Sequence, residues 1–226
     1  IDYLENISLK GIYSHLAIAE SDKGKNNPID FTQIQLNKFE KVLNDLGKRN
    51  QLLCRHLSNS AGTLLDSRLH FDMVRVGLSL YGYFPFNNFK SDLILKPALK
   101  VKARVTLVRD VEKGIGVGYG HFFKTQRKSK LAVVAMGYAD GVSRALSGKI
   151  SGSIDGVLVP QVGAIAMDQM VFDITEKPDI KIGQVLTLLG EDGEVFLSPH
   201  KWSEMSGSIP WEVLCSFRNR LPRVVT

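Results

Sequence analysis

The spacing of hydrophobic residues divides the chain into two parts with different patterns. In residues 1–90, short apolar runs alternate with a segment in which hydrophobic side chains recur at helical spacing. Within residues 30–47 they fall at Leu36, Phe39, Leu43 and Leu46. Asp30 and Gln33 form a start resembling a capping box, and Gly47 suits the end of a helix. This pattern predicts one amphipathic helix.

Short strands are predicted on both sides of that helix, over residues 9–17, 51–57 and 71–77, with a turn into a short helix at 58–66. Alternating strands and helices indicate a parallel sheet with helical crossovers. Three such strands make a poor domain by themselves, because both faces of a parallel sheet need cover. If they are the last part of a (β/α)8 barrel, their functional groups should lie at the carboxyl ends of the strands.

From about Asn87 the pattern becomes that of a β protein, and we take residues 91–226 as a second, mainly-β domain. Strand-like runs separated by Gly and Asp occupy 98–111, 130–139, 149–174 and 184–197. The pair Asp155–Gly156 predicts a hairpin turn. One helix is predicted in this half, with Ser198 as its cap, Pro199 in its first turn and Gly207 at its end.

Composition narrows the class of protein. With 44% hydrophobic residues, the 226-residue chain can form a folded core. The longest apolar run is too short to cross a bilayer, and the first residues have no signal-peptide pattern, so we expect a cytoplasmic protein without a membrane partner. Cys54 and Cys215 lie far apart and indicate reduced, buried thiols, and no metal-ligand spacing occurs.

The net charge of +6 raises the question of an anionic partner. The densest basic run, residues 124–130, has no interleaved aromatic residues and no nucleic-acid-binding motif around it. We therefore expect a solvent-exposed loop there and no nucleic-acid partner.

Polar residues at the predicted strand ends form a candidate site. Asn59 and Ser60 follow one strand and Gly77 follows another, and each precedes a helix, whose free N–H groups suit a phosphate. Arg75 lies in an apolar strand, where arginine is rarely buried without a partner, and His15 could be its neighbour. Purely structural explanations exist for each: a helix cap, a turn, an edge arginine and a core histidine.

Tyr138 stands between glycines in MGYADG, where an apolar run ends. Gly and Asp form turns and a half-buried tyrosine keeps its hydroxyl in water, so this stretch alone indicates no function.

Seven motifs occur in a fixed order along the chain: GIYSHLAIAE, NSAGTLL, HFDMVRVGLSLYGY, VGYG, MGYADG, VGAIAMDQM and RNRLPRV. Together they resemble alanine racemase, a family of pyridoxal-phosphate enzymes, over essentially the whole chain. The resemblance implies a cofactor-binding (β/α)8 barrel, a C-terminal β domain and a head-to-tail homodimer. It also implies two-base interconversion of L-alanine and D-alanine, which supplies D-alanine for peptidoglycan.

The resemblance further implies a role for individual residues. Tyr138 would be one of two catalytic acid/bases, and Met167 would line the substrate site, both acting in the partner's barrel. Arg75 would face the pyridine nitrogen of the cofactor, with His15 between Arg75 and the tyrosine. The cofactor's phosphate side would be held by Asn59, Ser60, Gly77 and Leu78.

Some features of the family have no counterpart in this sequence. The Schiff-base lysine and the arginine that binds the substrate carboxylate belong to a segment that nothing here resembles, so we expect these 226 residues alone to be inactive. Asn219 stands where some relatives have a phosphate-contacting tyrosine. Ala166 precedes Met167 where Cys or Ser is common, and Glu20 replaces an aspartate.

Other functions stay open at this point. A serine or broad-specificity racemase stays open, because the depth of the substrate pocket depends on residues that this sequence does not contain. A barrel-type decarboxylase usually places a carboxylate at the pyridine nitrogen, which Arg75 argues against. A non-catalytic dimerisation module would keep the fold without the cofactor.

Overall fold

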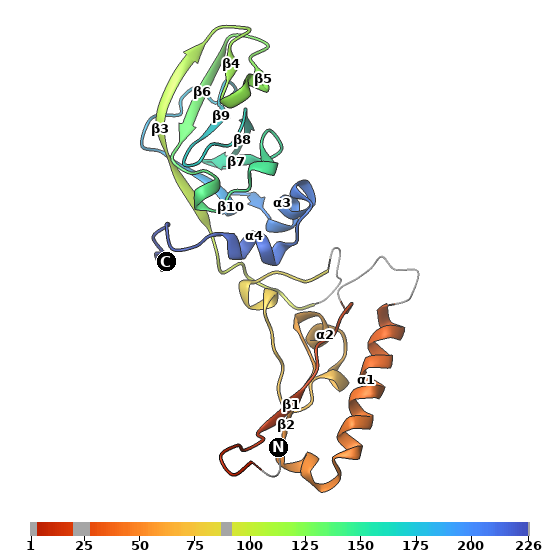
Figure 1. Cartoon of the computed structure of the whole chain (residues 1–226). Coiled ribbons are helices and arrows are strands. Elements are labelled where there is room, and N and C mark those ends of the chain that lie inside the picture. Colours follow the sequence, from red (N-terminus) through yellow and green to blue (C-terminus); the bar gives the residue numbers. More distant parts are fainter. Residues whose placement is uncertain (1–3, 20–27, 87–91, 226) are drawn as a thin grey trace. The chain divides into compact units, whose positions relative to one another are not determined.

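The computed structural model describes residues 4–19, 28–86 and 92–225. The chain divides into two compact units, which we call the α/β unit (Ile1–Ala98) and the β unit (Leu99–Thr226) (Figure 1). The domain boundary expected from the sequence, at residues 90–91, lies outside the described residues.

The α/β unit is built on two parallel strands and a long helix. Strand β1 (Gly11–Tyr13) pairs with β2 (Cys54–His56), and Tyr13 is the register partner of His56. Helix α1 (Pro28–Asp45) follows β1 in the sequence. It begins at Pro28 rather than at Asp30, which agrees with the preference of proline for the first turn of a helix. A 3₁₀ segment (Gly47–Leu52) then leads into β2.

The predicted strand over residues 71–77 does not form. This segment bonds to the chain of β2 at two points, Asp72 N–H to Arg55 O at 3.0 Å and Arg75 N–H to Ser58 O at 3.0 Å. These bonds are three residues apart on each chain, whereas a parallel ladder repeats every second residue. The segment therefore lies along β2 without joining it as a strand.

Helix α1 covers the hydrophobic core of this unit with one face. Leu36, Phe39 and Leu43 are buried, as the sequence spacing predicts. They pack with residues after the two strands and with helix α2 (Ser60–Leu65) in one cluster. At Gly62 of α2 a side chain would collide with Leu16. The cluster fixes the positions at which β1 and β2 end.

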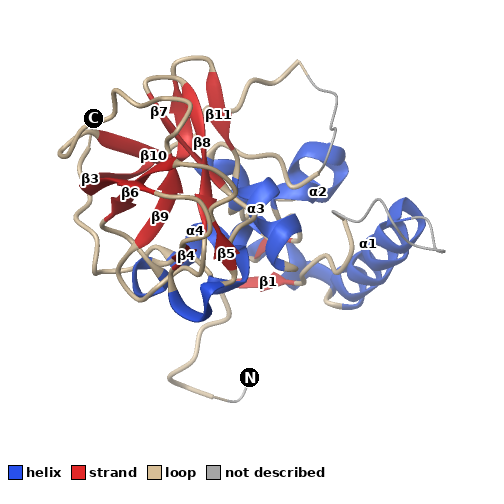
Figure 2. Cartoon of the chain, turned by 90° about the horizontal axis from the view of Figure 1, so that it is seen from above, coloured by secondary structure: helices blue, strands red, loops and turns tan. Residues whose placement is uncertain are grey.

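The β unit is a single antiparallel sheet in the order β11-β10-β3-β6-β9-β8-β7 (Figure 2). An additional pairing of β10 with β7 closes the ring from β10 to β7 into a barrel. Its strands are β3 (Val101–Val111), β6 (Ser129–Val134), β7 (Ser151–Ile154), β8 (Val157–Val162), β9 (Met170–Asp173), β10 (Val185–Asp192) and β11 (Val195–Leu197). A separate hairpin pairs β4 (Gly116–Val117) with β5 (Phe123–Lys124).

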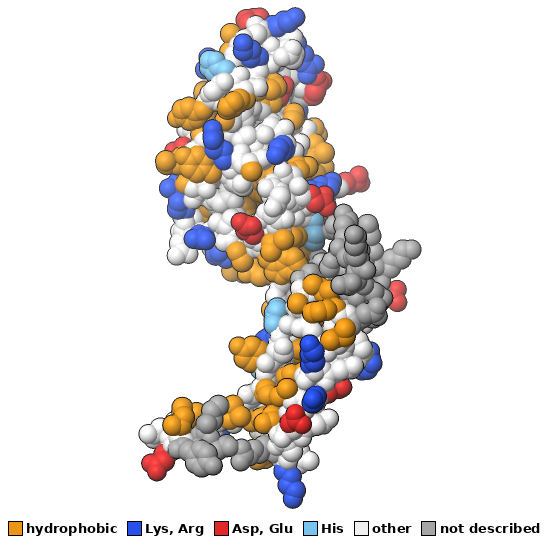
Figure 3. All heavy atoms as spheres, turned by 45° about the vertical axis from the view of Figure 1, so that its right-hand side comes forward, with side chains coloured by type: hydrophobic (Ala, Val, Ile, Leu, Met, Phe, Trp, Pro, Cys, Tyr) orange, Lys and Arg blue, Asp and Glu red, His pale blue; other side chains and the backbone are white. Residues whose placement is uncertain are grey.

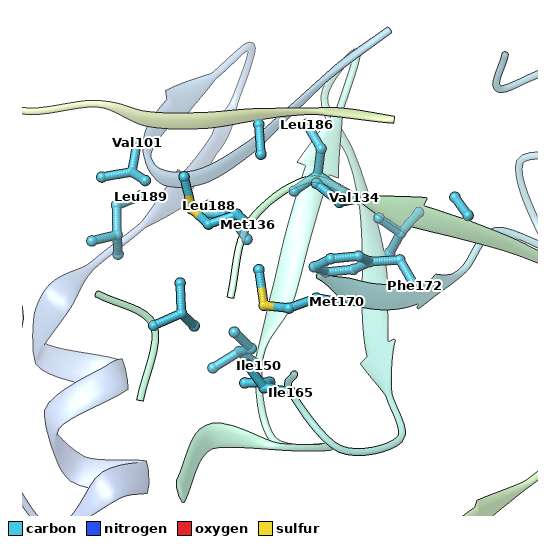
Figure 4. Packing of buried hydrophobic residues seen from close by; sticks show 14 of the residues in the cluster. Val101, Val134, Met136, Ile150, Ile165, Met170, Phe172, Leu186, Leu188 and Leu189 are labelled. Atoms are coloured by element: carbon cyan, nitrogen blue, oxygen red, sulfur yellow. The ribbon is translucent and has the colours of Figure 1, made fainter. Parts of the chain in front are cut away.

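Alternation along the strands fills the interior of this barrel. Along β3, Val101, Ala103 and Val105 are buried while the residues between them are exposed. Side chains from other strands and loops meet them, including Met136, Phe172 and Leu186 (Figure 4). A strand period of two therefore separates core from solvent here.

The predicted hairpin turn at Asp155–Gly156 is confirmed, with positive φ at both residues, +51° and +75°. Helix α3 (Pro199–Ser206) is also confirmed: Ser198 caps it and Gly207 ends it with φ +71°.

The expectation of one helix in this half is wrong. Helix α4 (Pro210–Ser216) follows, with Pro210 in its first turn. Val213 and Leu214 on this helix are buried. Seven residues are too short for the periodicity of hydrophobic residues to reveal a helix.

In the described part of the chain, no helix combines the length and hydropathy that a membrane span requires. In the same residues, no group of three or more His, Cys, Asp or Glu side chains could hold a metal ion. Cys54 and Cys215 are free thiols, as expected, but both are exposed, so the expectation that they are buried is wrong. On the face shown in Figure 3, basic and acidic side chains are interspersed over the upper part.

Candidate active site

Arg75 occupies the centre of a polar cluster at the ends of β1 and β2. Its backbone N–H bonds to Ser58 O, which places the side chain beside the strand ends. Nη1 lies 2.5 Å from Nδ1 of His56, and Nη2 donates to Ser14 O at 2.6 Å. Nη2 also lies 3.2 Å from Nδ1 of His15. The structure thus brings Arg75 and His15 together, as the sequence suggested, and gives both terminal nitrogens of this half-buried arginine their acceptors.

The Nε–H of Arg75 has no acceptor among the described residues. Both terminal nitrogens of Arg75 bond to protein acceptors, but the described part of the chain offers no acceptor to its Nε–H. An arginine carries only donors and keeps its charge. The Nε–H is therefore available to an acceptor that is not part of this unit.

Aromatic rings complete the cluster. The ring of Tyr13 stacks on His56 with centroids 5.1 Å apart and an interplanar angle of 9°. The guanidinium carbon of Arg75 lies 5.2 Å from the centroid of the same tyrosine ring. Burial, and then the positive charge of Arg75, lower the pKa of His56. The sequence analysis missed His56, although its place at the end of a predicted strand is the signal that identified His15.

A second cluster of donors surrounds Ser60. Its Oγ accepts from the backbone N–H of Gly77 at 2.9 Å and of Ser79 at 3.4 Å. Leu78 lies between these two residues at the start of a 3₁₀ turn (Leu78–Tyr81). Asn59 caps α2 by accepting from Gly62 N–H at 3.0 Å, so its amide oxygen has a structural role. Two backbone N–H groups thus point at a single acceptor, the Ser60 hydroxyl, which is the arrangement of donors that an anion's oxygen can also accept.

In the β unit, Tyr138 and Met167 are carried by two turns that bond to each other. Tyr138 N–H donates to Ala166 O and Ala139 N–H donates to Met167 O, both at 2.9 Å. A side chain at Gly137 would lie 2.2 Å from Ala166 O, so only glycine allows this approach. Both Tyr138 and Met167 are exposed, at 44% and 55%.

Tyr119, like Tyr138, is an exposed tyrosine in a glycine-containing turn. The sequence analysis gave it no role. It lies in the turn between β4 and β5, flanked by Gly118 and Gly120, both with positive φ. Its side chain is 72% exposed. The preceding residues pack on the other end of the loop that bears Met167: a side chain at Gly163 would lie 2.7 Å from Val117 O. The signal was available, because VGYG repeats the glycine–tyrosine pattern of MGYADG.

The sequence departs from the family pattern at three residues, Ala166, Asn219 and Glu20. Ala166 supplies the carbonyl that accepts from Tyr138 N–H, a bond that does not depend on its side chain. Asn219 is exposed near the C-terminus. Glu20 lies outside the described residues.

Family models match nearly the whole chain. Residues 1–85 match the alanine racemase N-terminal domain, and residues 98–225 match the alanine racemase C-terminal domain. The chain belongs to the alanine racemase family. The fold is accordingly the C-terminal part of the family's (β/α)8 barrel followed by its β domain.

Individual members of the alanine racemase family are similar to this chain over its whole length. An alanine racemase of Prochlorococcus marinus is 60% identical over 226 residues, which are 100% of this chain and 58% of the relative. An alanine racemase of Nostoc is 43% identical, over 99% of this chain and 57% of the length of that relative. The chain thus spans little more than half the length of the curated relatives that it matches.

Solved structures of the family superpose on both units. Alanine racemase of Bacillus anthracis with bound L-Ala-P has a TM-score of 0.84 at 30% identity, over 93% of this chain and 53% of its own. The Clostridium difficile enzyme in complex with cycloserine has a TM-score of 0.85 at 34% identity, over 97% and 57%. The Bartonella henselae enzyme with covalently bound pyridoxal phosphate has a TM-score of 0.80 at 36% identity, over 95% and 56%.

Proposed function

We propose that the protein containing this chain interconverts L-alanine and D-alanine with pyridoxal phosphate as its cofactor. The observation that carries this proposal is Arg75, a guanidinium held on both terminal nitrogens with its Nε–H still available. Family membership and relatives with bound L-Ala-P and pyridoxal phosphate support it. D-alanine would serve peptidoglycan synthesis.

The two donor clusters fit the two ends of this cofactor. A pyridine nitrogen is an acceptor, which matches the Nε–H of Arg75. A phosphate oxygen can replace Ser60 Oγ as the acceptor for Gly77 N–H, with the N–H of Leu78 beside it and the Ser60 hydroxyl as a further donor. Asn59 contributes by fixing the start of α2. When bound, the cofactor stabilises the negative charge left after the α-proton of alanine is removed.

Arg75 adapts this site to racemisation. Because a guanidinium does not release its proton, it leaves the facing nitrogen unprotonated. Arg75 would thereby weaken the ring of a bound cofactor as an electron sink, which disfavours side reactions that need a longer-lived negative charge. These residues therefore do not form a decarboxylase-type site, which would have a carboxylate at the position of Arg75. His15 contacts Arg75, and in the arrangement that we propose it would link Arg75 to the acid/base tyrosine.

Racemisation needs a proton acceptor on one face of the α-carbon and a donor on the other. The β unit offers two tyrosines for one of these roles, Tyr138, which the resemblance indicates, and Tyr119. A group that reaches into another subunit must project from its own, and the greater exposure of Tyr119 favours it as the base. Tyr138 and Met167 then line the substrate site. We propose a homodimer in which the loops that carry Tyr119, Tyr138 and Met167 complete the partner's site. We also propose a cytoplasmic location.

The test uses the full gene product that contains this chain. With pyridoxal phosphate and L-alanine, D-alanine should accumulate until the two enantiomers are nearly equal. In deuterium oxide, the α-hydrogen should be exchanged during this reaction. L-serine, supplied in a parallel assay, separates an alanine racemase from a broad-specificity enzyme. Release of carbon dioxide without D-alanine would instead establish a decarboxylase and refute the proposal.

A further inference from the structure

His56 is the last residue of β2, and its ring contacts Arg75 directly. Nδ1 of His56 lies 2.5 Å from Nη1 of Arg75. Because a guanidinium can only donate, Nδ1 must be the acceptor, so the imidazole proton of the neutral ring is on Nε2. The contact therefore fixes the tautomer of His56.

The plane of this imidazole is fixed as well. Tyr13 and His56 are partners in the parallel β1–β2 register, and their rings stack with an interplanar angle of 9°. Arg75 lies over the same tyrosine ring at 5.2 Å. The backbone carbonyl of His56 accepts from Nη1 at 3.2 Å, so His56 offers this nitrogen two acceptors.

We propose that His56 is a positioning residue that aims the Nε–H of Arg75 at the cofactor, and that it does so only as a neutral imidazole. The proposal rests on the proposed function, since it takes the pyridine nitrogen as the group that Arg75 faces. The guanidinium is planar, so holding Nη1 on His56 and Nη2 on Ser14 O and His15 determines the direction of Nε–H.

Protonation of His56 would end this arrangement. A second proton on the ring would face a guanidinium nitrogen at 2.5 Å, with two like charges and no acceptor. The groups facing the ring are Arg75 and Tyr13, with His15 on the far side of Arg75, and within the described residues no carboxylate contacts it. Burial and the charge of Arg75 lower the pKa of His56 below its ordinary value of 6.5, so the ring is neutral at neutral pH and gains a second proton only in acid.

Two substitutions at His56 distinguish the role of its Nδ1 acceptor from that of its flat ring. His56→Asn keeps an acceptor near the position of Nδ1 and does not titrate. His56→Phe keeps a flat ring for Tyr13 but removes the acceptor. His70 offers a matched control, because its Nε2 contacts Thr63 O at 2.9 Å, so His70→Phe also removes a bonded imidazole.

The first measurement is ¹⁵N NMR of the imidazoles in the cofactor-free full gene product. At about pH 7.5, Nδ1 of His56 should be unprotonated and Nε2 protonated. The second is the Kd for pyridoxal phosphate from about pH 8 to about pH 5. Wild-type affinity should fall about tenfold as His56 titrates, and His56→Phe should show a loss of that size already at pH 7.5. His56→Asn should bind well with a flat pH profile, and His70→Phe should follow the wild type.

A protonated Nδ1 at neutral pH would overturn the proposal, and so would wild-type affinity and pH dependence in His56→Phe. A tight, flat profile in His56→Asn excludes a purely structural role, because a structural loss would follow both substitutions. Failure of the proposed function is distinguishable: it would appear as absent D-alanine formation in the wild type, whereas the tautomer and the Kd values are measured without turnover.

Discussion

Arg220 donates from Nε to Oδ1 of Asp140 at 2.9 Å, while Oδ2 of the same carboxylate accepts from Gly137 N–H at 2.9 Å. The carboxylate is nearly buried, with only 8% of the side chain exposed. The C-terminal segment thereby holds the turn that carries Tyr138, two residues before Asp140.

Replacing Arg220 with Gln should leave this buried carboxylate without its cation. We expect a loss of about 1 kcal/mol in the free energy of unfolding, at the low end for charged hydrogen bonds because Arg220 is half exposed. Arg218→Gln, at an exposed neighbouring position, is the control. Chemical denaturation of both variants measures the difference. Equal midpoints would show that Asp140 does not depend on Arg220.

The two candidate tyrosines are distinguished by removing only the hydroxyl. Tyr119→Phe should reduce racemisation at least about a hundredfold, because the proton acceptor on one face of the α-carbon is lost. Tyr138→Phe should change the KM for alanine more than kcat, since that ring lines the substrate site. Both rates are measured in each direction, and each variant should retain the cofactor. A severe loss of kcat in Tyr138→Phe alone would return the acid/base role to Tyr138.

Arg75→Glu reverses the charge that faces the pyridine nitrogen. A carboxylate favours the protonated ring, so the ratio of transamination to racemisation should rise. Pyruvate and D-alanine released from L-alanine report the two reactions. Arg75→Lys keeps a cation and should keep the ratio low, even where the rate falls. An unchanged ratio in the Glu variant would place Arg75 away from the ring.

Asp72 provides a pH-dependent contribution to stability. Arg55 bonds to both carboxylate oxygens at 2.7 Å and also donates its backbone N–H, which lowers the pKa of Asp72 to about 2. A carboxyl whose pKa is depressed on folding stabilises the protein above its unfolded pKa of 3.8 and loses this contribution as the pH falls toward 2.

Asp72→Asn should therefore destabilise the protein at neutral pH and flatten the fall of stability between about pH 4 and pH 2. Because the pair is about one-third exposed, we expect less than about 1 kcal/mol. Thermal unfolding across this range checks the prediction, with Asp45→Asn, exposed at the end of α1, as the control. Parallel curves for the wild type and Asp72→Asn would contradict it.

A polypeptide of residues 1–226 alone should not racemise alanine. None of its lysines lies in a context that resembles the family's Schiff-base segment. Borohydride treatment in the presence of pyridoxal phosphate should leave no specifically labelled lysine, as judged by peptide mass spectrometry. Turnover or one stable lysine adduct would show that a lysine of this chain takes that role.

Much of the architecture could be read from local patterns. The alternation in β3 follows from the two-residue period of a strand, and the buried face of α1 follows from helical spacing. The turn at Asp155–Gly156 and the limits of α3 follow from residues whose backbone preferences are nearly independent of context. The seven motifs were enough for the family, and places near the predicted strand ends marked Arg75, His15 and Ser60 as candidates.

Tertiary structure decided what depends on contacts between distant residues. Residues 71–77 have strand-forming side chains, but the bonds to β2 fall out of the ladder period, so no strand results. The only sequence signal for His56 is its place at the end of a predicted strand, and its importance arises because β1–β2 pairing stacks it on Tyr13 and folding brings Arg75 into contact with it. The free Nε–H of Arg75 likewise appears only when every acceptor around it is known. Sequence patterns report local backbone preference, whereas a site depends on side chains that folding brings together.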